Sequence, residues 1–332
     1  MKIKEEALRK EWERNMRFTW TGEKFVVDHD ERIPRMLVGI DRMTFELVRS
    51  DSKLFSPKFS SDGDIEVAGN KLGRDLIALL RTFDPFLVRQ YFSSHAMSPY
   101  FELWEDHWDE VCSLLLLGTD VASVNAANQF VDRIRAVARR DDFTRVLRNH
   151  RRVASKNWQG FRTYIDSLFE KHSKLLVVRV DLGYRFNPLE SVPSRSHVGE
   201  LDVRKHLRKM LRYLRRRIPE CVGSAWKLEY GASKGYHVHL LVFLDGHKCR
   251  EGMTWGRRFC EKWDEITAGI GASWNCNADE ESYRKRGLLG IGLIHYADQE
   301  LRAGLVRTAM YLVKVDAYAK LKSKGKGRNF AH

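Results

Sequence analysis

The stretch SAWKLEYGASKGYHVHLLVFL, residues 224–244, decides the fold. Two runs rich in aromatic and aliphatic residues flank the segment GASKG, which begins and ends with glycine. Runs of strand length on both sides of such a short turn predict a β-hairpin. If GASKG closes the hairpin, Tyr230 pairs with Tyr236, and Glu229 lies opposite His237 on the same face of the sheet. A slip of one residue would move Glu229 to the other face.

The segments around this hairpin predict the rest of a sheet domain. The apolar run KLLVVRVDL is typical of a strand before the hairpin, and another short strand is expected after it. Basic or amphipathic stretches predict helices before, after and beyond the hairpin. The expected strands are 174–182 and 288–294, the helices are 201–217, about 257–268 and about 300–322, and a polar loop is expected at 272–287. We therefore predict the α+β class, with a central antiparallel sheet and helices packed on one side.

The first half of the chain has helical periodicity and no motif that suggests chemistry. The expected helices are 72–82, 99–117, 121–150 and 157–173, and a loop is expected at 56–64. We predict two domains from this contrast. Residues 1–152 would form a mainly α-helical N-terminal domain of unknown role, and residues 153–332 would form the sheet domain.

The charge of the chain is strongly uneven. The net charge is +14, from 58 Lys and Arg against 44 Asp and Glu. Residues 1–172 carry 28 basic and 27 acidic side chains, whereas residues 173–332 carry 30 and 17. An excess of this size in one half predicts nucleic acid as the partner of that half, with a solvated basic face as the alternative. The candidate phosphate contacts are Arg179, Arg204, Lys205, Arg208, Arg212, Arg215, Arg216, Lys322, Lys324, Lys326 and Arg328.

Composition argues against a membrane or secreted protein. The longest apolar run, Leu114–Leu117, is far shorter than the roughly 20 residues of a spanning helix. The first residues, MKIKEEALRKEWER, are too polar for a signal peptide. The five cysteines are scattered and contain no C-x-x-C pair, which favours reduced thiols. We expect a cytoplasmic protein.

Two histidines in the second strand of the hairpin predict a metal site. His237 and His239 are two residues apart, so a strand places both imidazoles on one face. Glu229 would join them if the hairpin has the expected register. Two nitrogens and a carboxylate leave coordination positions open, which suits Mg²⁺ or Mn²⁺ better than a closed zinc site. The alternative is a pair of buried, hydrogen-bonded histidines.

The last expected helix carries tyrosines that could act as nucleophiles. Tyr311 and Lys314 are three residues apart and share a helical face. Tyr318 would return to nearly the same face about 10 Å further along the helix. A tyrosine can attack phosphorus when a metal polarises the phosphate and a cation lies nearby. By itself the pattern Y-x-x-K is weak, and Tyr311 could equally be a residue of an amphipathic core.

In this order the motifs resemble the HUH endonucleases, and within them the rolling-circle replication initiators of the inovirus gene-two type, which also occur in prophages. The matching segments are LLVVRVDL (175–182), GYHVHLLVF (235–243), GIGLI (290–294), YLVK (311–314) and GRNF (327–330). The resemblance implies an HUH/Rep-like nuclease domain that nicks and rejoins single-stranded origin DNA. It implies His237, His239 and Glu229 as metal ligands, with Tyr311 as nucleophile and Lys314 beside it. Asp181 would have a structural role at the sheet end, or contact the metal shell or DNA.

The resemblance has limits and alternatives. Tyr318 lies two turns from Tyr311 and has no Y-x-x-K of its own, so chemistry that alternates between two tyrosines is doubtful. No P-loop motif is present, so a host helicase and polymerase would unwind and copy the DNA. A non-catalytic nucleic-acid-binding regulator or decayed initiator, or another metal-dependent hydrolase, stays open. The near-neutral first half would bind another protein or brace the nuclease rather than recognise duplex origin DNA.

Overall fold

The computed structural model describes residues 12, 18–20, 25–27, 32–59, 65–115, 120–185, 198–231, 235–285, 289–322 and 327–332. The chain forms two compact units. The sheet unit comprises Met1–Glu31, Ala154–Asp316 and Leu321–His332, and the helical unit comprises Arg32–Val153 and Ala317–Lys320. The division falls within one helix, between Val153 and Ala154, and it gives residues 1–31 to the sheet unit. None of the helices in these ranges combines the length and apolar character that a membrane crossing requires.

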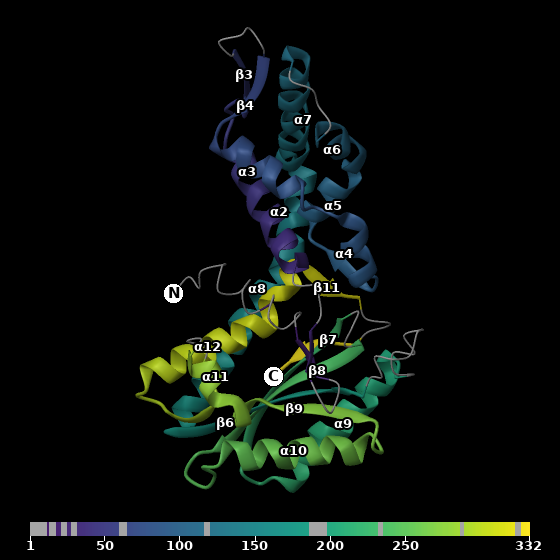
Figure 1. The fold of residues 1–332 in the computed structure, drawn as a ribbon. Helices are drawn as coiled ribbons and strands as arrows, with labels where there is room; N and C mark the ends of the chain where they lie inside the picture. Colours follow the sequence, from purple (N-terminus) through teal and green to yellow (C-terminus); the bar gives the residue numbers. More distant parts are fainter. Residues whose placement is uncertain are drawn as a thin grey trace. The chain divides into compact units, whose positions relative to one another are not determined.

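The helical unit consists mainly of helices, several of which have well-defined starts (Figure 1). Four of its helices begin at Asn70, Asp84, Ser98 and Asp120, and each of these side chains accepts a backbone N–H of the first turn. Such caps satisfy donors that a helix end leaves unpaired. The elements are α2 (Arg32–Val48), β3 (Phe55–Phe59), β4 (Ile65–Gly69), α3 (Lys71–Leu80), α4 (Pro85–Tyr91), β5 (His95–Met97), α5 (Pro99–Asp106), α6 (Trp108–Leu115), α7 (Val121–Arg139) and the first part of α8 (Asp141–Lys171).

This region differs from the sequence-based expectation in several places. The helices expected at 121–150 and 157–173 are instead α7, which ends at Arg139, and α8, which is continuous from Asp141 to Lys171. The single helix expected at 99–117 is two helices that meet at His107, whose backbone is not helical. The loop expected at 56–64 begins as a strand, because β3 pairs with β4; residues 60–64 lie outside the described part. The helix Arg32–Val48 was not expected, although its apolar face is buried.

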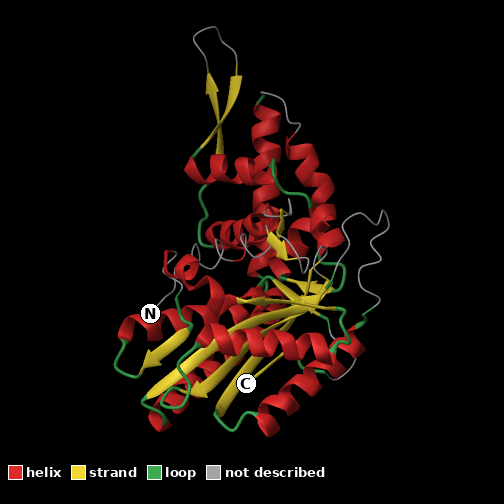
Figure 2. Cartoon of the chain, turned by 60° about the horizontal axis from the view of Figure 1, so that its bottom comes forward, coloured by secondary structure: helices red, strands yellow, loops and turns green. Residues whose placement is uncertain are grey.

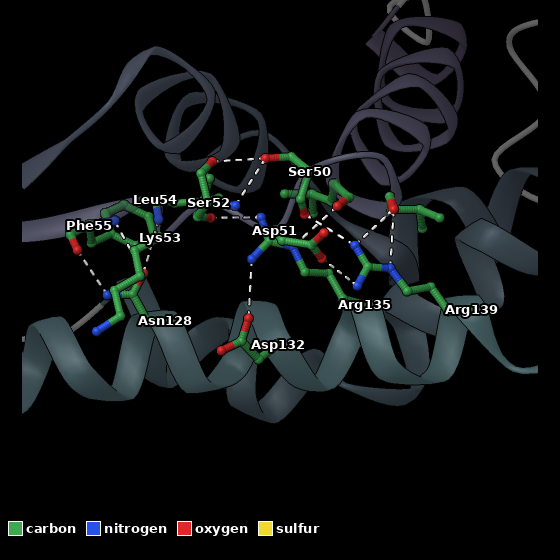
Figure 3. A network of polar contacts seen from close by, with 12 residues as sticks. Ser50, Asp51, Ser52, Lys53, Leu54, Phe55, Asn128, Asp132, Arg135 and Arg139 are labelled. Carbon is green, nitrogen blue, oxygen red and sulfur yellow. Dashed lines mark hydrogen bonds and ion pairs between the residues drawn. The ribbon is translucent and has the colours of Figure 1, made fainter.

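Side chains of α7 hold the segment that joins α2 to β3 (Figure 3). Arg135 is buried and donates to the carbonyl oxygens of Leu47 and Ser52, at 3.1 and 2.9 Å. Asn128 accepts the backbone N–H of Phe55 and donates to its carbonyl. These side chains from α7 therefore add hydrogen bonds to backbone groups at the end of α2 and in the segment after it.

The sheet unit is built around six antiparallel strands (Figures 1 and 2). Their order is β10-β6-β8-β7-β12, and β9 pairs with the C-terminal half of β6, residues 180–184. The predicted α+β class, with a central antiparallel sheet after a helical N-terminal region, is confirmed. The elements are β6 (Lys174–Tyr184), α9 (Glu200–Arg217), β7 (Cys221–Gly231), β8 (Gly235–Asp245), α10 (Gly252–Ile266), β9 (Gly271–Asn275), η1 (Cys276–Asp279), α11 (Glu280–Lys285), β10 (Gly292–His295), α12 (Gln299–Lys314), η2 (Val315–Ala317) and β12 (Phe330–Ala331). A separate pair joins β1 (Phe18–Trp20) and β2 (Phe25–Val27).

The hairpin has the predicted register. Tyr230 pairs with Tyr236, and Glu229 pairs with His237. The turn between β7 and β8 closes at Gly231 and Gly235, as the length of GASKG requires. This register places Glu229 on the same face as the imidazole opposite it.

Helices cover both faces of the sheet, so the expectation of helices on one side is wrong. One face of β6 and β8 packs against α9 and α10, which lie side by side (Figure 1). The other face packs against α8 and α12, as the ring of Tyr164 beside Phe243 and the ring of Tyr311 beside His239 show. The strands LLVVRV and HLLVFL do not alternate between apolar and polar residues, which is the pattern of strands buried on both faces.

Two expected boundaries in the last third of the chain are also wrong. The polar loop expected at 272–287 contains β9, η1 and α11. The helix expected at 300–322 ends at Lys314; a 3-10 turn and a short strand, β11 (Ala319–Leu321), follow and β11 pairs with β5. The buried Asp316 forms an ion pair with Lys227 of the sheet, and this contact fixes the chain at the point where it leaves the helix.

Candidate functional site

The hairpin brings two imidazoles and a carboxylate together on one face of the sheet. The Nε2 atoms of His237 and His239 lie 3.5 and 3.3 Å from Oε2 of Glu229. These three side chains form the group among the described residues that could hold a metal ion, with ligand atoms within 4.8 Å of one another. His239 is buried, whereas His237 and Glu229 are partly accessible. The site therefore lies in the sheet but is open on one side.

Both imidazoles are oriented through their Nδ1 atoms. Nδ1 of His237 donates to the carbonyl oxygen of Gly235 at 3.1 Å, and Nδ1 of His239 donates to Oδ1 of Asp181 at 2.7 Å. A carbonyl oxygen and a carboxylate accept protons, so each Nδ1 carries one. The Nε2 atoms then face Oε2 of Glu229 and are the atoms through which the imidazoles would bind a metal, as metal-binding histidines do.

The geometry of the cluster fits a divalent metal. Oε1 of Glu229 is buried and has no hydrogen-bond partner among the described residues, although a buried carboxylate oxygen without a partner is costly. Two ligands about 2.1 Å from one ion lie about 3.0 to 3.4 Å apart at angles near 90 to 109°, and the observed separations are 3.3 and 3.5 Å. A metal held by these two nitrogens and one oxygen would keep coordination positions open.

Charges in the cluster shift the pKa of His239. Burial lowers this pKa, but the carboxylates of Asp181 and Glu229 outweigh burial and raise it to about 9. Burial likewise raises the pKa of Glu229, while the charge of His239 and hydrogen bonds from both imidazoles hold it well below its usual range. Without metal, the cluster at neutral pH thus carries a proton on His239 that a metal must displace.

Two residues of β6, the buried Arg179 and the half-buried Asp181, support His239. Arg179 is buried and forms an ion pair with Asp181, Nε to Oδ1 at 3.1 Å and Nη2 to Oδ2 at 3.2 Å. The guanidinium of Arg179 also lies over the ring of Tyr283, 6.0 Å from its centroid. The expected contact of Arg179 with DNA is therefore a misassignment, because its guanidinium is enclosed by these partners. Of the roles considered for Asp181, the hydrogen bond to His239 favours support of this candidate metal ligand.

The helix α12 places Tyr311 beside this cluster. The ring of Tyr311 is buried, and its centroid lies 6.4 Å from that of His239. The helix approaches the segment before β10 closely. A Cβ added to Gly304 would lie 1.7 Å from the carbonyl oxygen of Leu289, and a Cβ on Gly290 would lie 2.3 Å from the backbone nitrogen of Leu305. Glycine at both positions lets the backbones touch and sets the distance of Tyr311 from the sheet.

Residues 138–332 match the family model of the YagK/YfjJ C-terminal domain. The matched range holds the whole six-stranded sheet, the histidine and glutamate cluster, and α12. The chain belongs to the YagK/YfjJ family. This family is found in prophage-type proteins, which agrees with the prophage side of the resemblance. Searches of curated proteins and of solved structures gave no match, so the likeness to HUH endonucleases rests on the residues themselves.

The other two candidate catalytic residues of this YagK/YfjJ chain lie in different surroundings. Lys314 is exposed at the last turn of α12, one turn after Tyr311. Tyr318 is not on α12, because the helix ends at Lys314; it belongs to the helical unit, where its carbonyl accepts the backbone N–H of Ser98 at 2.8 Å. The expectation that Tyr318 shares a helical face with Tyr311 is wrong.

Sequence reasoning missed a buried ion pair at the YagK/YfjJ site. Lys227 pairs with His239 across the strands, so its side chain lies on the face of the cluster. It is buried and bonds to Oδ1 of Asp316, just after α12. The signal was present, because Lys227 precedes Glu229 by two residues and therefore shares its face.

More than half of the basic residues expected to hold DNA lie away from the cluster. These residues are on α9, and α9 covers the face of the sheet opposite His237, His239 and Tyr311. Arg204 is not free either: it forms an ion pair with Glu200 and donates to the carbonyl oxygen of Arg328. The exposed members of the set are Lys205, Arg208, Arg212, Arg215, Arg216, Lys322 and Arg328, while Lys324 and Lys326 lie outside the described residues.

Proposed function

We propose that the sheet unit is a metal-dependent nickase and strand transferase of the HUH type, which opens and rejoins single-stranded origin DNA during rolling-circle replication. The observation that carries the proposal is the convergence of three candidate ligand side chains beside the ring of Tyr311, among them Glu229, whose Oε1 is buried without a hydrogen-bond partner in the described residues. Ordinary core packing gives no reason for two imidazoles, a carboxylate and a phenol to meet on one sheet face.

Each residue has a role that its position supports. His237, His239 and Glu229 would hold Mg²⁺ or Mn²⁺, which when bound supplies positive charge to a phosphate oxygen. Tyr311 attacks the phosphorus through its phenolic oxygen and releases its proton to water. The bond from phosphorus to the 3′ oxygen breaks, and that oxygen takes up a proton from water and leaves as a 3′-hydroxyl. The DNA stays on Tyr311 as a 5′-phosphotyrosine, and the reverse reaction rejoins a strand.

Neighbouring groups assist without reacting. Asp181 and Arg179 hold the imidazole of His239 in one orientation. Lys314 is exposed one turn from Tyr311, and its cation would offset negative charge as the phosphate approaches. The excess of positive charge in residues 173–332 and membership of a family found in prophage-type proteins support DNA as the substrate.

The proposal is tested by covalent capture. Short labelled single strands that carry phage-type origin sequences are incubated with the full chain and Mn²⁺, and denaturing gels reveal adducts. We expect an adduct that requires metal and that disappears in Tyr311→Phe, a change that keeps the ring. Tyr318→Phe is the matched control and should leave the adduct intact. An adduct that persists in Tyr311→Phe would refute the assignment of the nucleophile.

A non-catalytic nucleic-acid-binding regulator is the second candidate. The burial of Tyr311 is the observation that favours it, because a core tyrosine needs no substrate. This candidate predicts DNA binding that depends on salt but not on Mn²⁺, and no adduct with any origin sequence. The same gels and a binding titration with and without metal separate the two.

A further inference from the structure

From Lys205 to Arg216 the outward face of α9 is entirely basic. Val203, Leu207, Met210 and Leu214 point into the core beneath the sheet. With 100° between successive residues, six positions of this stretch lie on the opposite side of the helix, and every one is an exposed lysine or arginine; the exposed Leu201 precedes them on that side. They are Lys205, Arg208, Lys209, Arg212, Arg215 and Arg216, which we name the α9 ridge.

The α9 ridge is electrostatically unfavourable in the protein without a bound partner. Its members are spaced three and four residues apart, so like charges lie next to one another along the helix and repel. No ion pair joins any of the six to a carboxylate of the described residues. A solvated helix face usually mixes both signs of charge. A face of one sign is stabilised when a polyanion neutralises it.

The ridge cannot serve the site around Tyr311 and His239 directly. That site lies on one face of the sheet, and α9 packs on the other. A layer spacing of about 10 Å plus a helix radius of about 5 Å puts the ridge roughly 15 Å below the sheet. DNA held at the ridge therefore contacts a surface separate from the reacting phosphate.

The chemistry of the ridge selects the kind of polyanion. None of the six positions is apolar, and Leu201 before them is a single exposed apolar side chain, which is too little to anchor the ridge in a lipid surface. None is aromatic, so unpaired bases would find no ring to stack on. From Lys205 to Arg216 the helix rises about 16 Å, which matches about five phosphates along one strand of a duplex.

The seam between α9 and α10 extends the same surface. Arg258 of α10 donates to the phenolic oxygen of Tyr213 at 3.1 Å and lies over the ring of Trp255 at 4.9 Å. Lys262 lies over the ring of Tyr213 at 5.0 Å. Cations thus cover the aromatic rings of the seam, and the surface offers positive charge rather than bare rings.

We propose that the α9 ridge is a second nucleic-acid surface, which binds the phosphate backbone of duplex DNA independently of sequence while single-stranded DNA occupies the opposite face of the sheet. The binding depends on charge and position and does not require that the sheet unit be a nickase.

The test neutralises four ridge residues in the full chain and compares binding with adduct formation. The variant is Lys205→Gln, Arg208→Gln, Arg212→Gln and Arg216→Gln. The control removes the same charge from exposed positions of the helical unit, through Arg42→Gln, Lys58→Gln, Lys71→Gln and Arg81→Gln. Affinity for a 20-base-pair duplex without origin sequence is measured over a range of salt, and adducts are measured on a short single strand.

We expect the ridge variant to lose at least about tenfold in duplex affinity at 0.1 M salt, with the log–log salt slope reduced by about 3 to 4. Its adduct yield and melting temperature should not fall. An unchanged slope, or an equal loss in the control, would overturn the proposal, as would loss of the single-strand adduct. If no protein forms adducts, the nickase proposal fails, and the duplex titration still decides the role of the ridge.

Discussion

Removal of the charge of Lys227 should destabilise the sheet unit more than any exposed lysine change. The side chains of Lys227 and Asp316 are only 2% and 7% exposed. In Lys227→Met the carboxylate of Asp316 stays buried without its partner. Breaking a buried pair from one side costs about 3 to 5 kcal/mol, a large share of the 5 to 15 kcal/mol that is typical of a folded domain.

A second variant separates the loss of the pair from the cost of an unpaired charge. Lys227→Met combined with Asp316→Leu replaces both charges by apolar groups, and such replacements are often neutral or stabilising. We therefore expect the double variant to recover most of the stability. Lys262→Met is the control, because its ion pair with Glu265 has side chains 24% and 69% exposed and should cost less than about 1 kcal/mol.

The assay is urea unfolding combined with amide hydrogen exchange of β7, β8 and α12. Exchange reports the sheet unit separately from the helical unit. In Lys227→Met the amides of α12 should lose protection first, since Asp316 ties the end of that helix to the sheet. A double variant as unstable as the single one, or a single variant no worse than Lys262→Met, would refute the reasoning.

Three further predictions concern the site. Asp181→Asn should weaken Mn²⁺ binding about 10- to 100-fold in a titration, because His239 loses its orienting carboxylate; an unchanged affinity would contradict the supporting role. Because the pKa of His239 is raised to about 9, its protonation stabilises the metal-free fold by an amount on the order of 3 kcal/mol, which is fully present below about pH 6.5 and is lost as pH rises through 9. The free energy of unfolding in EDTA at pH 6 and at pH 9.5 measures this contribution. His239→Gln should remove the difference between the two pH values. Gly304→Ala should push α12 away from Leu289, lower the free energy of unfolding by about 1 to 3 kcal/mol and lower the adduct yield. Ala303→Ser on the same helix is the control and should change neither the stability nor the adduct yield.

The sequence was most informative where local chemistry decides the structure. The five-residue GASKG turn determines the register of the hairpin, so the pairing of Glu229 with His237 followed from the sequence alone. The strand period then placed His239 on the same face. The α+β class followed from the order of elements, and the end of α9 followed from Pro219.

Other features depend on contacts between distant residues. The last helix was predicted too long, because the partner of Asp316 is Lys227, far away in sequence. Strand β9 was missed, since GASWN becomes a strand only by pairing with β6. Arg179 was taken for a surface cation, although Asp181 and Tyr283 enclose it. The continuous apolar runs of β6 and β8 did carry the signal for helices on both faces.

The short strand β12 has a consequence for self-association. It pairs with β7 through Phe330 and Ala331, and the backbone N–H of Leu228 donates to the carbonyl oxygen of Asn329 at 2.8 Å. An uncovered edge of β7 would present free N–H and C=O groups to any extended peptide. A chain shortened before residue 328 would lose this cover, and its sheets could join edge to edge into aggregates. Residues 329–331 therefore occupy part of the edge of the strand that carries Glu229 and prevent another chain from pairing there.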